Sequence, residues 1–414
     1  MRFACHKRRP GARPVSAVTS PIRLGVLGLG RAFTLMVPTF SHDARIQIVA
    51  GFDPRESATS LLNSEFGARQ HRSPEALCSD PDVEWVYVAT PHQYHVEHVT
   101  LAASHGKHVL VEKPMALSLV DCQRMIQACL QFNTRLIVGH SHSFNAPVRI
   151  ARCMIDSGRY GQVRMVHAMN FTDFLYRPRR PEELDTAKGG GVVFSQAAHQ
   201  VDIVRLLAGG MVTSVYARTG RWDVSRPTEG AYSAILNFAN GAFANLSYNG
   251  YGYFDSDVLM GWIGEMGRTK SPEVHSQTRA KARATSDESA EANRKAERNY
   301  GGKDYLSNID QPAQSFQHFG PVIVSCDDAD LQLTPNGVTV HDATGSHPTV
   351  AAVPTVARSE VIDELWAVAR LGKPPVHDGQ WSMATMEVCL AILASDNQHR
   401  AIILEHQVRP STYE

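Results

Sequence analysis

The first third of this chain alternates short apolar segments with amphipathic ones, and this alternation limits its possible folds more than any other feature. Buried strands are predicted at residues 22–27, 46–52, 83–89, 109–111 and 135–139. Helices are predicted between them, most clearly at 93–106 and 118–132. Strands joined by helices pair in parallel through right-handed crossovers, so we predict an α/β protein with a doubly wound parallel sheet.

A glycine turn follows the first predicted strand. Gly28 and Gly30 allow the backbone to approach a pyrophosphate, which then binds at the N-terminus of the next helix. The full dinucleotide fingerprint needs a third small residue, and Phe33 stands in its place, so the match is partial. Asp53 ends the next strand, where an acid can bind the ribose hydroxyls of NAD. This acid would repel a 2′-phosphate and favours NAD, although the nearby Arg55 leaves NADP open.

Two opposite charges, Glu112 and Lys113, stand together at the carboxyl end of the strand at 109–111. Ligands of open α/β sheets bind outside the carboxyl ends of the strands. Pro114 also biases Lys113 toward an extended backbone. The stretch therefore predicts a rigidly held lysine at a ligand site, although the pair alone is equally compatible with a solvated strand end.

Histidines follow the strand at 83–89, which ends in Thr90, Pro91 and His92. His95 lies one turn further, at the start of a predicted helix. Both histidines are either surface residues or face a bound cofactor. A zinc site is not predicted, because no acid or thiol ligands share this spacing.

A polar stripe crosses an otherwise apolar helix that is predicted after the three glycines at 189–191. Ser195, His199 and Asp202 fall on one face of this helix at helical spacing. Buried polar groups cost free energy unless they are paired. Two interpretations follow. Either His199 is buried in the core and hydrogen-bonded by its neighbours on the helix, or the three residues form the catalytic face of a site.

The second half of the chain has the pattern of an antiparallel sheet. Strands are predicted at 163–172, 212–221, 231–238 and 242–248. Asn240-Gly241 and Asn336-Gly337 are strong hairpin signals between such segments. Residues 267–302 are polar and charged, and 277–298 within them are predicted as an exposed helix or a mobile flap. Helical periodicity at 359–371 and 381–395 predicts helices that pack back across both halves.

The composition excludes several classes of protein. Lys and Arg number 41, as do Asp and Glu, so the chain lacks the basic excess of proteins that coat nucleic acid or anionic membranes. The seven cysteines show no CxxC spacing, which favours a reducing cytoplasm over a disulfide framework or a metal site. No apolar run approaches the roughly 18 residues of a membrane span. Residues 1–20 are basic without an apolar core and predict a disordered tail.

The combination of these motifs resembles the Gfo/Idh/MocA oxidoreductases. It rests on Gly28-x-Gly30, Asp53, Thr90-Pro91-x-x-x-His95 and, as the most specific element, Glu112-Lys113-Pro114. The resemblance implies a Rossmann domain at 21–145 and a C-terminal α/β domain at 146–414 with a large, mostly antiparallel open sheet. In this family the open face of that sheet commonly forms an oligomer interface, which implies a homodimer or homotetramer.

The resemblance also implies roles for individual residues. Catalysis is expected from Lys113 as general base, with His199 sharing the substrate oxygen and Asp202 orienting His199. Cofactor contacts are expected from Gly28, Gly30, Arg31, Ala32, Asp53, Thr90, Pro91, His92, His95, Glu112 and Lys113. Substrate contacts are expected from Tyr176, Arg177, Arg179, Arg180, Ser195 and His199. No metal is expected.

The sequence also leads to an expectation about the substrate. Ser195 replaces an acid that commonly touches sugar hydroxyls in the family, and Ala197 replaces a glycine, which puts a polyol substrate in doubt. Three arginines and three aromatic residues at 171–181 suit an aromatic carboxylate, unless they form a solvated basic loop. The segment 170–205 resembles the branch that includes 4,5-dihydroxyphthalate dehydrogenase, which implies oxidation of a cis-dihydrodiol. The alternatives are a sugar or cyclitol dehydrogenase, or a non-catalytic NAD-binding sensor.

Overall fold

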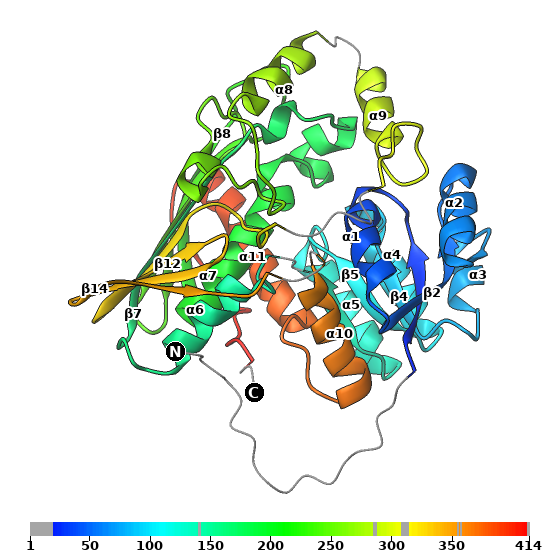
Figure 1. The fold of residues 1–414 in the computed structure, drawn as a ribbon, viewed down its shortest axis with the longest axis horizontal. Helices are drawn as coiled ribbons and strands as arrows, with labels where there is room; N and C mark the ends of the chain where they lie inside the picture. The colour runs from blue at the N-terminus through cyan, green and yellow to red at the C-terminus, as the bar shows by residue number, and fades with distance from the viewer. Residues whose placement is uncertain are drawn as a thin grey trace, which may run out of the picture.

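The computed structural model describes residues 20–139, 142–284, 288–307, 314–353, 356 and 358–411. Apart from Ser20, the predicted disordered tail lies outside these residues. The described chain forms two domains side by side, each built on one sheet (Figure 1). No described helix has the length and apolar character needed to cross a membrane.

The N-terminal domain is a six-stranded parallel sheet with the order β3-β2-β1-β4-β5-β6, as the alternating pattern predicted. Its strands are β1 Ile22–Leu27, β2 Ile46–Phe52, β3 Arg69–Gln70, β4 Trp85–Val88, β5 His108–Glu112 and β6 Leu136–Gly139. Its helices are α1 Arg31–His42, α2 Glu56–Phe66, α3 Pro74–Cys78, α4 His95–Ser104 and α5 Leu119–Gln131. The strand order reverses between β1 and β4, and a ligand crevice is expected at the carboxyl ends of these two strands.

The C-terminal domain is a nine-stranded sheet with the order β14-β13-β12-β11-β7-β10-β9-β8-β15. Its strands are β7 Val163–Phe171, β8 Val212–Gly220, β9 Ala231–Phe238, β10 Phe243–Asn249, β11 Val322–Cys326, β12 Ala329–Thr334, β13 Gly337–Asp342, β14 Gly345–Val350 and β15 Ile402–Ile403. Only β7 and β10 pair in parallel among the described strands of this sheet. Both predicted hairpins are present, with Asn240-Gly241 joining β9 to β10 and Asn336-Gly337 joining β12 to β13.

Four helices join the domains or cover the large sheet: α6 Ala146–Asp156, α7 Ala198–Ala208, α10 Ser359–Leu371 and α11 Gly379–Gln398 (Figure 1). Every residue of α7 is buried. α10 adds Val361, Ile362 and Leu365 to the core that contains α1. α11 contacts α5 and β6 of one domain and α7 and β8 of the other. The C-terminal helices therefore tie the two domains together around the carboxyl ends of the parallel strands.

The polar segment at 267–302 contains α8 Val274–Arg283 and α9 Glu288–Glu297, and it ends in a buried tyrosine. The Tyr300 ring packs edge-on against Phe33, with 5.0 Å between the ring centroids. The Tyr300 hydroxyl donates to Glu65 at 2.6 Å and its backbone N–H donates to Thr34 Oγ1 at 2.9 Å. This docking accounts for Phe33 at the third glycine position, because its ring packs against a residue of the other domain.

Candidate active site

Lys113 lies at the carboxyl end of β5 and crosses the boundary between the domains. Its Nζ donates to the backbone carbonyl of Ser195 at 2.8 Å. Burial lowers the pKa of Lys113 to about 8, and the like charges of Arg358 and Arg179 act in the same direction. The carboxylate of Glu112 opposes this shift. The structure thus provides a lysine that loses its proton far more readily than one in water.

Glu112 is the last residue of β5. It accepts a hydrogen bond from the Tyr87 hydroxyl of the neighbouring strand β4. Arg358, Glu112 and Tyr87 line a small cavity together with Gly139 at the end of β6. The peptide bond between Lys113 and Pro114 is cis.

His95 fastens the Lys113 turn to the next loop. Its Nδ1 lies 3.0 Å from the carbonyl oxygen of Pro114, and its Nε2 lies 3.0 Å from that of Thr90. Both nitrogens of His95 therefore contact backbone carbonyls, and the side chain has no exposed surface. These contacts are those of a residue that holds the two loops together, and its predicted contact with the cofactor stays a prediction. Pro91 begins the short turn that carries His92, whose pKa is lowered to about 3 by burial and by the charges of His95 and Lys113.

The glycine turn has the geometry that a dinucleotide requires. Gly28 has a φ of +90°, and a Cβ there would lie 2.9 Å from the backbone of Ala89 and Thr90. Gly30 has open space around it, and the N-terminus of α1 has no side-chain cap. Arg31, the first residue of the helix, is exposed, and Ala32, the second, is half-buried, so the helix N-terminus is accessible to an anion.

Asp53 lies against this turn at the carboxyl end of β2. Its Oδ2 accepts from the backbone N–H of Leu29 at 2.7 Å, and its Oδ1 pairs with Arg55 Nε at 2.9 Å. Arg55 also donates to the carbonyl oxygens of Leu29 and Tyr300. Asp53 and Arg55 therefore lie together beside the glycine turn and pair with each other, and the predicted contact of Asp53 with a ribose stays a prediction.

The helix that carries the polar stripe begins with a wide π-turn at Val193–Ala197 and continues as α7. The Ser195 carbonyl at this turn holds Lys113, and His199 follows one turn later. The His199 ring packs against His142 and Phe319, at centroid distances of 4.6 and 5.2 Å. Lys113 and His199 are therefore brought to one place from opposite domains.

Asp202 joins α7 to α11. Its Oδ1 accepts from the indole Nε1 of Trp381 at 2.6 Å, and its Oδ2 lies 3.7 Å from His377 Nε2. Burial lowers the pKa of His377, but the carboxylates of Glu364 and Asp202 outweigh burial and raise it. The contacts of Asp202 are those of a structural anchor, and its predicted role in orienting His199 stays a prediction.

The arginines of the predicted substrate loop have carboxylate neighbours within the protein. Arg177 pairs with Asp173 at 2.7 Å and with Glu265 at 3.3 Å. Arg180 pairs with Glu182 at 3.1 Å. These ion pairs leave less of the loop's positive charge for a ligand than the sequence suggested.

The other two side chains of this loop also have protein partners. Arg179 donates to the Phe174 carbonyl at 2.7 Å and lies 3.7 Å from Glu183. The Tyr176 hydroxyl donates to Asp223 at 2.7 Å. The positive charge of Arg179 nevertheless contributes to the lowered pKa of Lys113.

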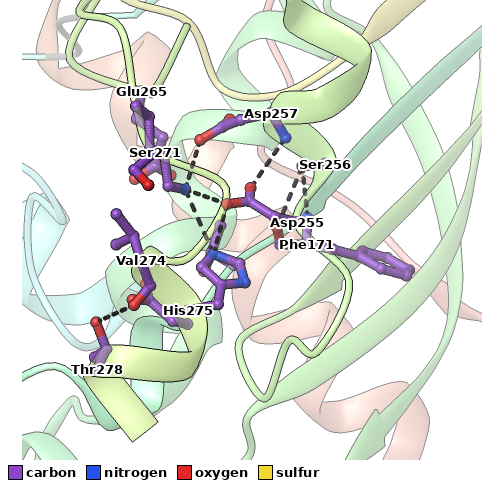
Figure 2. A network of polar contacts seen from close by, with 12 residues as sticks. Phe171, Asp255, Ser256, Asp257, Glu265, Ser271, Val274, His275 and Thr278 are labelled. Atoms are coloured by element: carbon purple, nitrogen blue, oxygen red, sulfur yellow. Dashed lines mark hydrogen bonds and ion pairs between the residues drawn. The ribbon is translucent and has the colours of Figure 1, made fainter. Parts of the chain in front are cut away.

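A polar network of buried side chains lies in the segment between residues 255 and 278 (Figure 2). Lys270 Nζ lies 2.6 Å from Asp255 and 2.7 Å from Asp257, and His275 Nε2 lies 3.1 Å from Asp255. Figure 2 shows Asp255, Asp257 and His275 converging beside Glu265, the partner of Arg177. The network fixes the segment that carries Glu265. No group of metal-ligand type with three or more His, Cys, Asp or Glu members occurs among the described residues.

Sequence reasoning missed three residues that the fold brings to the site: His142, Gln317 and Arg358. The charge of Arg358 lowers the pKa of Lys113, and the charge of Lys113 lowers the pKa of His142. Gln317 accepts a hydrogen bond from Arg358. They come from segments far apart in the chain that carry no recognisable motif. Only their burial as polar residues distinguishes them, and burial at such positions is not visible in one sequence.

Comparison with known proteins agrees with this geometry. Residues 22–140 match the oxidoreductase family with an NAD-binding Rossmann fold (GFO_IDH_MocA), and residues 148–269 match the GFO/IDH/MocA C-terminal domain. The chain is 46% identical over 373 residues to the 1-carboxy-3-chloro-3,4-dihydroxycyclohexa-1,5-diene dehydrogenase of Comamonas testosteroni, covering 90% of this chain and 94% of that protein.

Two further relatives have lower sequence identity. A Bordetella bronchiseptica RB50 protein assigned as a dehydrogenase has a solved structure with a TM-score of 0.87 and 38% identity, covering 93% of this chain and all of the other. The myo-inositol 2-dehydrogenase of Thermotoga maritima is 26% identical over 270 residues, covering 62% of this chain and 77% of that protein. The chain therefore belongs to the Gfo/Idh/MocA family and is an NAD(P)-dependent dehydrogenase with an N-terminal NAD-binding Rossmann domain.

Proposed function

We propose that this dehydrogenase oxidises a carboxylated cyclohexadiene cis-diol to a hydroxyketone that tautomerises to a catechol. The observation that carries the proposal is the 46% identity, over nearly the whole of both chains, to a dehydrogenase whose name gives a carboxylated dihydroxycyclohexadiene as its substrate. The inositol dehydrogenase similarity is weaker and covers less of the chain. The replacement of the expected acid by Ser195 also disfavours a polyol.

In the proposed mechanism, Lys113 is the general base. NAD, held by the glycine turn and Asp53, would supply the acceptor for the hydride that leaves the carbinol carbon. Lys113 Nζ takes the hydroxyl proton, for which it must be neutral, and its lowered pKa makes this state accessible. The His199 ring would contact the same substrate oxygen, and the buried His142 and Phe319 rings exclude water beside it.

The direct test is the absorbance of NADH at 340 nm with purified protein, NAD and a panel of substrates. The panel contains 1-carboxy-3,4-dihydroxycyclohexa-1,5-diene, the cis-dihydrodiol of phthalate, myo-inositol and xylose. We expect reduction of NAD with the carboxylated diols alone. Faster reduction with inositol or xylose would replace the proposal by a cyclitol or sugar dehydrogenase, and NAD binding without any turnover would favour the sensor.

The pH dependence should follow Lys113. Diol oxidation requires the neutral amine, so kcat/KM should rise about tenfold per pH unit below a pKa of about 8 and level off above it. The measurement is kcat/KM from pH 6 to pH 10 in buffers of constant ionic strength. A profile that is flat, or that rises near pH 6.5 instead, would assign the base to another group such as a histidine.

Cofactor preference should depend on Asp53. We expect Asp53→Ser to raise the ratio of kcat/KM for NADP to that for NAD at least about tenfold, because it removes a carboxylate that repels the 2′-phosphate and releases Arg55. Arg55→Ser in the same assay separates the two effects, since it removes only the base. An unchanged ratio in Asp53→Ser would show that the ribose binds elsewhere.

We also propose that two or four copies assemble through the open face of the large sheet. Tyr216, Ile235 and Phe243 on the adjacent strands β8, β9 and β10, and Ile323 on β11, are between 40% and 46% exposed. Apolar residues that gather on one exposed face favour association. Light scattering should give two or four times the chain mass of 45.5 kDa, and Ile235→Asp should lower it. A wild-type protein of one chain mass would refute this proposal.

A further inference from the structure

Arg358 stands beside the candidate site as a buried cation that has no carboxylate partner in the part of the chain that the structure describes. It lies directly before α10, is 8% exposed, and its Nε donates to Gln317 Oε1 at 3.1 Å. Among the described residues, no carboxylate oxygen lies within 4.0 Å of its guanidinium, although Glu112 lines the same cavity. A buried charge is stable when it is paired, so an unpaired one indicates a place for an anionic ligand.

The adjacent Gln317 points to the same conclusion through an independent observation. Its side chain is 4% exposed, and its amide nitrogen has no hydrogen-bond partner among the described residues. Because Arg358 occupies the amide oxygen, the orphaned nitrogen lies next to the guanidinium. Both neighbouring groups therefore have N–H donors with no acceptor among the described residues, and a carboxylate, which has two oxygens and only accepts, matches such a pair.

The pair lies close to the reacting groups. Arg358 lines a cavity with Glu112, the neighbour of Lys113 in the chain, and Gln317 stands two residues before Phe319, whose ring packs against His199 at 5.2 Å. The charge of Arg358 contributes to the lowered pKa values of Lys113 and His142. His142 in turn packs against His199 at 4.6 Å between centroids. A ring whose hydroxyl contacts Lys113 and His199 would therefore have its other substituents near Arg358.

The arginines of the loop at 171–181 are weaker candidates for the same task. Arg177 and Arg180 already pair with protein carboxylates, as described above. The remaining one, Arg179, donates to a backbone carbonyl and stacks over the Phe174 ring at 3.5 Å. Arg358 differs from these three arginines, because among the described residues it has neither a carboxylate nor a backbone carbonyl partner.

We propose that Arg358 and Gln317 bind the carboxylate of the substrate and thereby select carboxylated diols over uncharged ones. The inference rests on the proposed function for the identity of the substrate. The chemistry of the Arg358–Gln317 site is independent of the proposed function, because these two side chains would bind a carboxylate on any ring. Its test therefore combines turnover with a binding measurement that needs no turnover.

The first variant is Gln317→Glu, which keeps the size of the side chain and its contact with Arg358 but places a negative charge against the substrate carboxylate. KM for the carboxylated diol should rise about 10- to 100-fold, the effect of losing a charge-assisted contact. The Kd for NAD should change less than about twofold. Arg358→Met should act in the same direction, with Arg358→Lys recovering part of the loss. Arg164→Met, an exposed arginine far from the site, is the control for loss of a charge.

The binding measurement is calorimetry with 3,4-dihydroxybenzoate and with catechol in the presence of NADH. The wild type should bind the benzoate at least about tenfold more tightly than catechol, and Gln317→Glu should remove that difference. Equal affinities in the wild type would overturn the inference even if the diol is oxidised. A loss of NAD binding equal to the loss of benzoate binding would also overturn it, because the pair would then serve the cofactor.

Failure of the proposed function has a different signature. If the wild type oxidises no carboxylated diol yet distinguishes the benzoate from catechol through Gln317, the carboxylate site stands and the substrate ring is wrong. If Arg180→Met raises KM for the diol while Arg358→Met and Gln317→Glu do not, the loop binds the carboxylate and the inference is wrong. Thermal unfolding of each variant within a few degrees of the wild type confirms that folding is intact.

Discussion

Replacing Lys113 by Met should lower kcat for diol oxidation by about a hundred- to ten-thousand-fold, the usual contribution of a positioned general base. Methionine keeps the length of the side chain and removes the amine, so the proton of the substrate hydroxyl has no acceptor. The Kd for NAD should change by less than about threefold, because the glycine turn and Asp53 are untouched. The measurements are steady-state kinetics at 340 nm and calorimetric titration with NAD.

Lys113→Arg is the matched control for this prediction. It retains a cation and a donor for the Ser195 carbonyl, but a guanidinium does not lose its proton in the working pH range. A general base therefore requires both variants to be inactive. Substantial activity in Lys113→Arg would show that Lys113 contributes only a positive charge. Full activity in Lys113→Met would show that Lys113 takes no part in the reaction.

Replacing Trp381 by Ala should lower the free energy of unfolding by about 3–5 kcal/mol, the range for truncating a buried aromatic residue. Trp381 is 2% exposed and joins α11 to α7, where its indole donates to Asp202 and its ring packs under Arg205 at 3.9 Å. The truncation leaves a cavity and deprives a buried carboxylate of a donor. Because α7 carries His199, catalytic activity should fall with stability. Denaturant unfolding followed by circular dichroism measures the first effect.

Two variants calibrate this result. Trp381→Phe keeps most of the ring and loses the hydrogen bond, so it should cost about 1–3 kcal/mol. Trp222→Ala truncates a tryptophan that is 65% exposed and should cost much less than Trp381→Ala. If Trp222→Ala and Trp381→Ala lower the free energy of unfolding equally, the contact between α7 and α11 adds no more stability than an exposed tryptophan does.

The arginine loop shows most clearly where sequence reasoning reaches its limit. Arg177, Arg179 and Arg180 stand together in the chain and suggested a carboxylate site. The structure gives Arg177 a partner in Glu265, nearly 90 residues away, and the backbone of Arg179 a partner in Glu291, more than 100 residues away. A local pattern shows where charges are, whereas distant residues decide whether they are already neutralised.

What the sequence determined by itself was local in origin. The periods of apolar residues determined the parallel and antiparallel sheets, and the glycine turn and the Glu112-Lys113-Pro114 step determined where the cofactor and base were expected. The tertiary structure decided which groups converge there. It seated Tyr300 on Phe33, turned Asp202 toward Trp381, and placed Arg358 and Gln317 near Lys113. The physical reason is that backbone pattern follows from neighbours in the chain, whereas burial, pairing and pKa depend on contacts that only the folded chain makes.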